Sequence, residues 1–176
     1  MTHSTPEDAP AGTPETTALG SPDSTPAPSS EDKPDTWRGI ELVRIGTARY
    51  KATNARGGLV PMGSGGDDPD FTPVELLLAA LAGCAGVTVD ELTSRRAEPV
   101  SFNVTAEGHK VHDEGGSHMV GLKVTFDVTF PEGEDGDRAR EFLPRAIAQT
   151  HDRICTVSRT VALGEPVEYA VAEDHR

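Results

Sequence analysis

The stretch FTPVELLLAALAGCAGVTVDELTSRR, residues 71–96, decides the fold because it predicts one long buried helix. Thr72 suits the N-cap, Pro73 the first helical position and Glu75 the third, which completes a T-x-x-E capping box. Residues 76–89 carry no charge, and a helix that is apolar on every face is expected to be buried all round. Fourteen such residues are too few to cross a bilayer, which takes about 20. We therefore expect a core helix.

The middle of this helix holds Cys84 among the small residues Gly83, Ala85 and Gly86, which let another backbone approach closely. A domain of this size can cover one face of the helix with a sheet and another with a second helix. The small residues therefore suggest a third neighbour. A second copy of the chain is the simplest source, so we expect a two-fold homodimer.

Residues 1–36 differ in composition from the rest of the chain. They hold seven of the 14 prolines, twelve Ser or Thr residues, and Leu19 as their one large apolar residue. Such a segment cannot bury enough apolar surface to offset the entropy lost on ordering. We expect residues 1–36 to be a disordered acidic tail and residues 37–176 to form the folded domain.

The net charge and the cysteine content limit the classes of function that fit this chain. The formal net charge of −13 argues against binding to nucleic acid or to anionic membrane surfaces. The N-terminus has neither the basic start nor the apolar run of a secretory signal. With only two cysteines, the cytoplasm is the expected compartment, where disulfides are more often transient and redox-active than structural.

The remaining segments predict an α+β domain with antiparallel strands. Strict alternation of apolar and polar residues marks the strands, and apolar residues at helical spacing mark a second helix. In chain order we expect two or three short strands within 37–60, the helix just described, strands at 100–107 and 120–130, a second helix capped by Asp137 and ending near Cys155, and a last strand at 166–171.

Cys84 and Cys155 admit three interpretations from chemistry alone. They can be buried small hydrophobes, since free cysteine is among the most often buried residues. They can be a redox pair, in which one thiolate attacks an oxidant and the other thiol resolves the sulfenic acid. A zinc site built on His151 and Cys155 has suitable i, i+4 spacing but lacks a second ligand pair.

A redox pair requires a depressed pKa at the attacking thiol. Cys84 lies too far from the start of its helix to gain from the helix dipole. A cation must then come from elsewhere, and Arg44, Arg49 and Arg56 in the N-terminal strands are the candidates.

Two stretches together resemble the OsmC/Ohr family: TPVELLLAALAGC (72–84) and, about 70 residues later, AIAQTHDRICTVS (146–158). The resemblance implies an OsmC-like fold, an intertwined homodimer in which antiparallel sheet wraps a long central helix. It also implies thiol-dependent reduction of hydroperoxides, chiefly organic ones, in defence against oxidative stress. Cys84 would then be the peroxidatic cysteine and Cys155 the resolving one. No metal, flavin or other cofactor is implied, and the reductant would be a dithiol, possibly on a lipoylated protein.

This sequence departs from the family pattern at the start of the helix. Active peroxidases have a glutamate directly after the proline, paired with an arginine that activates the thiol. Here that position is Val74, and the acid is Glu75. A straight helix separates Glu75 from Cys84 by about 13 Å of rise and about 900° of rotation, on opposite faces. Glu75 is therefore either a catalytic residue or only the capping-box acid.

The arginine position also stays open. Arg49 is favoured because it lies on the return strand of the expected hairpin, with Arg44 close behind. Thr156 follows the second cysteine where the family often has proline. Together the sequence predicts a cytoplasmic hydroperoxide reductase with catalytic Cys84, Cys155, Glu75 and Arg49. The alternative is a non-catalytic, small-ligand-binding or redox-sensing protein of the same fold.

Overall fold

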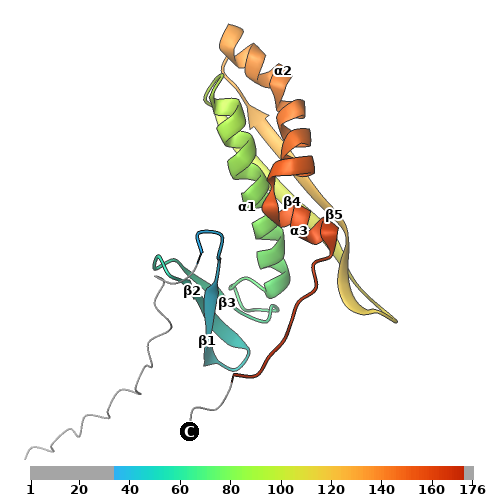
Figure 1. Cartoon of the computed structure of the whole chain (residues 1–176). Helices are drawn as coiled ribbons and strands as arrows, with labels where there is room; N and C mark the ends of the chain where they lie inside the picture. The colour runs from blue at the N-terminus through green and yellow to red at the C-terminus, as the bar shows by residue number, and fades with distance from the viewer. Residues whose placement is uncertain (1–33, 173–176) are drawn as a thin grey trace, which may run out of the picture. The chain divides into compact units, whose positions relative to one another are not determined.

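A computed structural model describes residues 34–172 of the chain. Its elements form two antiparallel sheets and a group of helices (Figure 1). In chain order they are β1 (Ile40–Gly46), β2 (Arg49–Asn54), β3 (Leu59–Met62), α1 (Pro73–Ser94), β4 (Ser101–Asp113), β5 (Gly116–Thr129), α2 (Glu134–Gln149), a π-helical turn (Thr150–Ile154) and α3 (Thr156–Leu163). The predicted α+β class is confirmed, with three α-helices where two were expected.

Most of the predicted tail, residues 1–33, lies outside the described residues. The chain separates into a compact unit from Ile40 onward and a preceding unit that ends at Gly39. The described part of the preceding unit holds a turn in which the Trp37 amide donates a hydrogen bond of 2.8 Å to the Pro34 carbonyl. The disorder predicted for residues 1–36 remains a prediction.

The start of α1 follows the expected capping box. The Thr72 hydroxyl accepts a 3.3 Å bond from the Glu75 amide, and the Glu75 carboxylate accepts a 2.7 Å bond from the Thr72 amide. Pro73 occupies the first turn, where a missing N–H removes no helical bond. The predicted helix start is therefore confirmed.

The expectation that α1 is buried all round is not met within one chain. One face is buried, formed chiefly by Leu81, Ala85, Val89 and Thr93 at a spacing of four residues. Val87 on another face is 63% exposed. Over its full 22 residues α1 is also long and apolar enough to span a bilayer, a property that core helices of soluble domains share.

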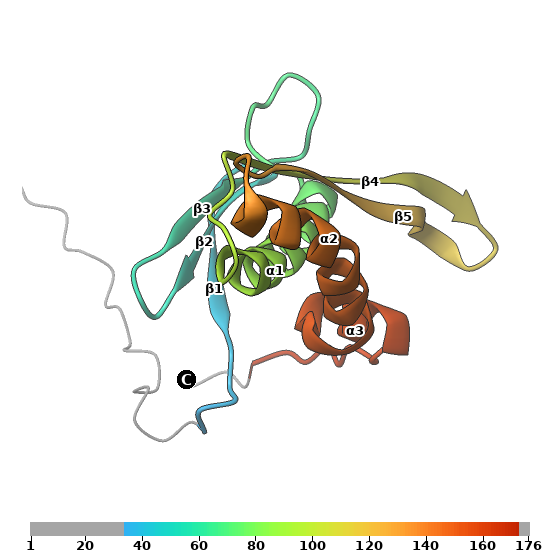
Figure 2. The same cartoon turned by 90° about the horizontal axis from the view of Figure 1, so that it is seen from above.

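The β4–β5 hairpin packs against the helices with its apolar face. Phe102 and Phe126 meet edge to face, with ring centroids 6.1 Å apart. Figure 2 shows α1, α2 and α3 on the same side of this hairpin. A register shift after Glu107 interrupts the pairing, so Val120, which the alternation predicted to be buried, is 39% exposed. The antiparallel pair itself is confirmed.

The second helix begins earlier than predicted. α2 starts at Glu134, and Asp137 is inside it, donating its amide to the Gly133 carbonyl at 2.9 Å. Three acidic residues in the first turn stabilise this helix start, because their negative charges interact with the positive end of the helix dipole. Position 136 in this helix requires glycine, because a Cβ there would lie 1.8 Å from the Pro131 carbonyl oxygen. The predicted cap at Asp137 is therefore wrong, because the N-cap is Gly133.

The C-terminal part of the chain differs most from the sequence prediction. Helix α3 follows Cys155 where only a connection was expected, and it ends at Gly164 in the left-handed conformation, with φ of 63°. Residues 166–171 are not a strand within the described chain. Among the described residues no strand forms backbone hydrogen bonds with this segment, so it belongs to neither sheet. Val167, Tyr169 and Val171 are left exposed.

Candidate functional site: two cysteines at the start of helix α3

Cys84 sits in the middle of α1, where regular helix geometry fixes its backbone. Its carbonyl accepts a 3.1 Å bond from the Thr88 hydroxyl one turn later. The side chain is half-buried. Gly83 beside it is exposed, and a Cβ at that position would meet no atom of another segment within 4 Å in the described part of the chain. The helix face next to Cys84 is therefore open in the single chain.

Cys155 is held differently, at the N-cap of α3. A π turn precedes it, with one residue more than an α-helical turn. The Cys155 amide donates a 2.9 Å hydrogen bond to the Thr150 carbonyl and so completes that turn. The backbone of Cys155 is then extended, with φ −66° and ψ 104°. Its Sγ accepts a 3.4 Å hydrogen bond from the Ser158 amide, in the manner of a capping side chain. The side chain is completely buried.

The fold brings the two thiols into contact although they lie 71 positions apart in the sequence. The two side chains lie close enough for each to shift the pKa of the other, and both are free thiols. This is the pairing that the redox interpretation requires. It is a property of the tertiary structure, since the residues come from separate helices.

The two thiols differ in acidity. Burial raises the pKa of Cys84, and its interaction with Cys155 raises it further, while the Val157 and Thr156 amides act in the opposite direction without outweighing these effects. Burial also acts to raise the pKa of Cys155, but hydrogen bonds from Cys84, from Ser158 and from the Val157 amide outweigh it and lower the pKa overall. Within the described residues, the surroundings of Cys84 do not lower its pKa overall, although Cys84 was predicted to attack.

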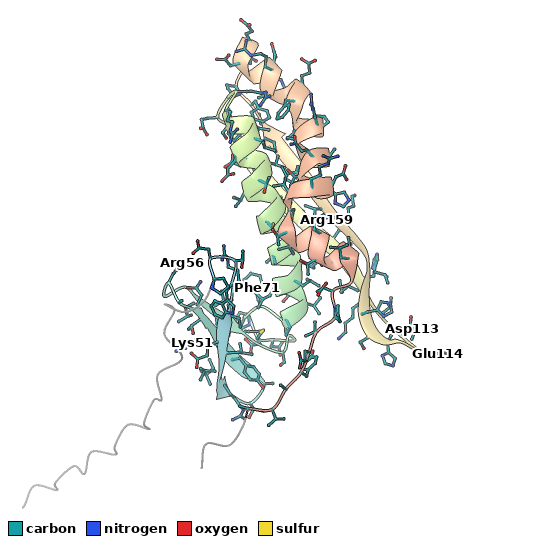
Figure 3. The ribbon with its side chains drawn as sticks, in the orientation of Figure 1. Lys51, Arg56, Phe71, Asp113, Glu114 and Arg159 are labelled. Atoms are coloured by element: carbon teal, nitrogen blue, oxygen red, sulfur yellow. The ribbon has the colours of Figure 1, made fainter. Side chains whose placement is uncertain are left out.

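Arg49, the favoured activating residue, has acidic partners in the loop after β3. Its Nε lies 3.3 Å from Asp68 Oδ2, and its Nη2 donates to Asp70. Neither Arg44 nor Arg56 forms a side-chain ion pair with another described residue. Arg56 lies on the β2–β3 turn (Figure 3). Across residues 34–172 no arginine acts on either thiol. A catalytic role for Arg49 remains a prediction.

Glu75 is occupied by the helix cap. Its carboxylate accepts hydrogen bonds from the amide and the hydroxyl of Thr72, and these bonds lower the pKa of Glu75. Helix α1 runs without interruption from Pro73 to Ser94, so nothing bends Glu75 toward Cys84. The geometry accounts for Glu75 as a capping residue, and its catalytic role remains a prediction.

An apolar cavity of about 480 Å³ lies beside the cysteine pair. Side chains from four elements line the cavity, together with two polar residues of the π turn. Leu81 and Ala85, which flank Cys84 on α1, form one wall, and Ser158, which bonds Cys155, forms another. Neither cysteine is among its lining residues.

The zinc alternative finds no support in the described part of the chain. No group of three or more His, Cys, Asp or Glu side chains is placed to hold a metal ion among residues 34–172. His109, His112 and His118 lie on the β4–β5 hairpin, where His112 contacts the Ser117 hydroxyl at 3.0 Å and His118 lies near Asp113. Figure 3 labels Asp113 and Glu114 at the tip of that hairpin.

Sequence reasoning missed Ser158, Val157 and the helix that presents them. The signal was present: Ser158 stands three residues after Cys155, the spacing of a cap, and Gly164 follows at the distance of a short helix. It was overlooked because cysteine is not among the usual N-cap residues. The π turn has no comparable signature in the sequence.

Comparison with known proteins agrees with this fold. Residues 65–170, more than half of the chain, match the family described as OsmC-like protein. The chain therefore belongs to the OsmC-like family, as the two cysteine-containing stretches predicted.

Uncharacterized proteins of Mycobacterium tuberculosis and Mycobacterium bovis are 30% identical to this chain over 131 residues, which cover 74% of this chain and 93% of each relative. An OsmC-like protein of unknown function from Vibrio cholerae has a TM-score of 0.60 at 12% identity, covering 71% of this chain and 93% of that one. An organic hydroperoxide resistance protein OsmC from Legionella pneumophila has a TM-score of 0.51 at 15% identity, covering 73% and 91%. At these identities the two structures show the fold alone.

Proposed function

We propose that this protein is a cytoplasmic, thiol-dependent hydroperoxide reductase that acts in oxidative-stress defence through Cys84 and Cys155. The observation that carries the proposal is the contact between two thiols that lie far apart in the sequence. Two cysteines placed only to fill a core have no need to meet. Membership of the OsmC-like family, which includes a protein described as conferring organic hydroperoxide resistance, supports the same conclusion.

The proposed reaction has two steps. The Cys84 sulfur attacks the terminal oxygen of the hydroperoxide, the O–O bond breaks, and an alcohol leaves with the proton while Cys84 becomes a sulfenic acid. Cys155 then attacks the Cys84 sulfur, a disulfide forms and water leaves. A dithiol such as a lipoyl group restores both thiols by exchange and is itself oxidised to a disulfide. No metal or organic cofactor takes part.

The apolar cavity supports an organic hydroperoxide as substrate. Its walls reach the cysteine pair through Leu81, Ala85 and Ser158, so an alkyl or aryl group could be buried beside the reacting sulfur. Hydrogen peroxide has no apolar part to bury there. The same cavity favours the second candidate function, a protein that binds a small apolar ligand without turning it over.

One assay separates the two functions. The reduced protein is mixed with one equivalent of cumene hydroperoxide, and intact mass and free thiols are measured, followed by turnover with dihydrolipoamide. The reductase should lose two hydrogen atoms and two thiols and then regain them. Cys84→Ser should abolish the change. An unchanged mass together with saturable binding of cumyl alcohol would favour the ligand-binding function.

We further propose that the functional unit is a homodimer. Large apolar side chains are exposed on both β1 and β3, among them Ile40 at 69% and Leu59 at 56%. The open face of α1 and the unpaired segment 166–171 are further surfaces that a second copy could cover. The partner could also supply the cation that Cys84 lacks within its own chain.

A further inference from the structure

Two threonine side chains in the described part of the chain are almost completely buried, Thr93 at 0% and Thr150 at 1% exposure. The Thr93 hydroxyl donates a 2.9 Å hydrogen bond to the Val89 carbonyl one turn earlier in α1. The Thr150 hydroxyl, by contrast, has no hydrogen-bond partner among residues 34–172. A buried hydroxyl without a partner costs free energy on folding, so its presence calls for an explanation.

The two backbone groups of Thr150 are both in use. Its amide donates to the Ala146 and Ile147 carbonyls at the end of α2, and its carbonyl accepts the Cys155 amide across the π turn at 2.9 Å. A threonine hydroxyl in a helix can bond the carbonyl four residues earlier, as Thr93 does, but Thr150 does not. The side-chain hydroxyl is therefore the one polar group of Thr150 that other described residues leave unbonded. It lies at a π turn, an element frequently found at functional sites.

Thr150 also lies on the wall of the apolar cavity of about 480 Å³ beside the cysteine pair. Most of the other lining residues are apolar, Leu81 and Phe126 among them. Val161 and His151 line the cavity as well and are exposed, so the cavity opens to solvent on that side. A mostly apolar cavity with a few polar groups is the usual form of a small-molecule site.

The polar lining residues are Thr150, His151 and Ser158, and they differ in what they can offer a ligand. The Ser158 amide already donates to the Cys155 sulfur at 3.4 Å, and His151 is exposed. Thr150 is the buried one, and its hydroxyl is free of other described residues. No Asp, Glu, Lys or Arg side chain of residues 34–172 lines the cavity, so a charged ligand would lose its hydration there without compensation.

We infer that the Thr150 hydroxyl determines ligand specificity by hydrogen-bonding the oxygen of a neutral ligand whose apolar body fills the cavity. The ligand class is an alkyl or aryl molecule that carries one hydroxyl or hydroperoxyl group. A threonine hydroxyl can both donate to and accept from such an oxygen. The inference deepens the proposed function and rests on it for its biological meaning, since an organic hydroperoxide and the alcohol it yields both belong to this class. Thr150 positions the ligand and takes no part in the bond changes.

The test is a binding cycle with two probes that differ by one hydroxyl. Reduced full-length protein is titrated with cumyl alcohol and with cumene, and ligand-observed NMR gives both dissociation constants. Thr150→Val keeps the shape of the side chain but removes its hydroxyl. The preference for cumyl alcohol is the ratio of the cumene constant to the cumyl alcohol constant. It should be about fivefold or more lower in Thr150→Val than in wild type, because the alcohol oxygen loses its hydrogen bond.

Thr93→Val is the matched control. It removes the hydroxyl of the other buried threonine, which is not a lining residue of the cavity, and should leave the preference unchanged. Thr150→Ser keeps a hydroxyl and should retain the preference of wild type. If Thr150→Val fails to fold, judged by circular dichroism, Thr150→Ala takes its place and is compared with Thr150→Ser.

The ligand-free protein provides a second measurement. Thr150→Val should raise the thermal midpoint, because it removes a buried hydroxyl that has no partner, whereas Thr93→Val should lower it by removing a hydrogen bond. A midpoint that falls in Thr150→Val as it does in Thr93→Val would overturn the inference, because the hydroxyl would then already be bonded in the folded protein. An equal preference for cumyl alcohol in wild type and Thr150→Val would overturn it as well.

The binding cycle needs no turnover, so its result is separable from the proposed function. A protein that shows the expected ratios but does not reduce cumene hydroperoxide would keep the ligand class and lose the reductase activity. A protein that reduces cumene hydroperoxide with the same preference in wild type and Thr150→Val would keep the activity and lose the inference.

Discussion

At the scale of single residues, the chain uses one capping geometry twice. The Thr72 oxygen accepts from the amide of Glu75, and the Cys155 sulfur accepts from the amide of Ser158, in each case three residues ahead. The first cap stabilises the start of α1. The second places a titratable atom at the start of a helix, where its charge is stabilised. The same local bond therefore has different consequences because the capping atoms differ in chemistry.

The role of Glu75 can be tested at this scale. Glu75→Gln should shift the thermal midpoint by less than about 2 °C, because glutamine can also accept the Thr72 amide bond. Thr72→Ala should cost about 1 kcal/mol, since it removes the cap itself. Neither variant should change the alkylation rate of Cys84. A marked loss of rate in Glu75→Gln, with an intact fold, would instead make Glu75 catalytic.

The pH dependence of that cap has a definite sign. The Thr72 bonds lower the pKa of Glu75 in the folded protein, so their contribution to stability is complete above the ordinary pKa of glutamate. It is lost as pH falls through the lower value of the folded state. The stability difference between wild type and Glu75→Gln should accordingly shrink in acid, as measured by urea unfolding at several pH values.

At the scale of elements, the site depends on the junction between α2 and α3. The π turn ends the long second helix and redirects the chain, so that Cys155 starts a new helix instead of continuing the old one. In a continuous helix its sulfur would have no free amide to face. Helix α3 is short and depends on its two caps, Cys155 and Gly164.

The C-cap of α3 provides a test of this element. Gly164 has a φ of 63° and no atom within 4 Å of a Cβ built there, so the cost of a side chain comes only from its backbone. Gly164→Ala should destabilise the protein by about 1 kcal/mol, and Gly164→Asn by less, because asparagine tolerates the left-handed region better. Chemical denaturation measures both. Equal stability of the three proteins would mean that α3 does not end at Gly164.

At the scale of the whole molecule, one chain leaves much of its apolar surface uncovered. Large apolar side chains are exposed on β1, β3 and α1, among them Ile40, Leu59 and Val87. Exposed apolar patches mark sites of protein–protein interaction. The acidic net charge of −13 keeps such a chain soluble but does not bury those side chains. A second copy would cover them and complete the surroundings of Cys84.

Gly83→Leu tests this assembly sharply. Among residues 34–172 no atom of another segment lies within 4 Å of a Cβ built at Gly83, whereas one at Gly86 would already contact Val104 at 3.4 Å. Overpacking at Gly83 can therefore act only against another molecule, at a cost of about 1–3 kcal/mol. Analytical ultracentrifugation should show a dimer for wild type and a dimer dissociation constant raised about tenfold or more in Gly83→Leu. Wild type that sediments as a monomer at micromolar concentration would refute the dimer.

The sequence by itself determined those features that depend on local chemistry and on periodicity. The cap, the first turn and the length of α1 follow from residues within a few positions of one another. The β4–β5 hairpin follows from alternation, and the family follows from the two stretches around Cys84 and Cys155. These features need no knowledge of distant contacts.

The tertiary structure alone decided what lies next to what. It brought Cys84 against Cys155, placed the Ser158 amide on the buried sulfur, and gave Glu75 and Arg49 partners other than the thiols. It also left segment 166–171 without a strand partner in this chain. A thiol's acidity depends on burial and on hydrogen bonds from groups remote in sequence, and a strand exists only when another strand lies beside it. Neither property can be assigned to a residue before its neighbours in space are known.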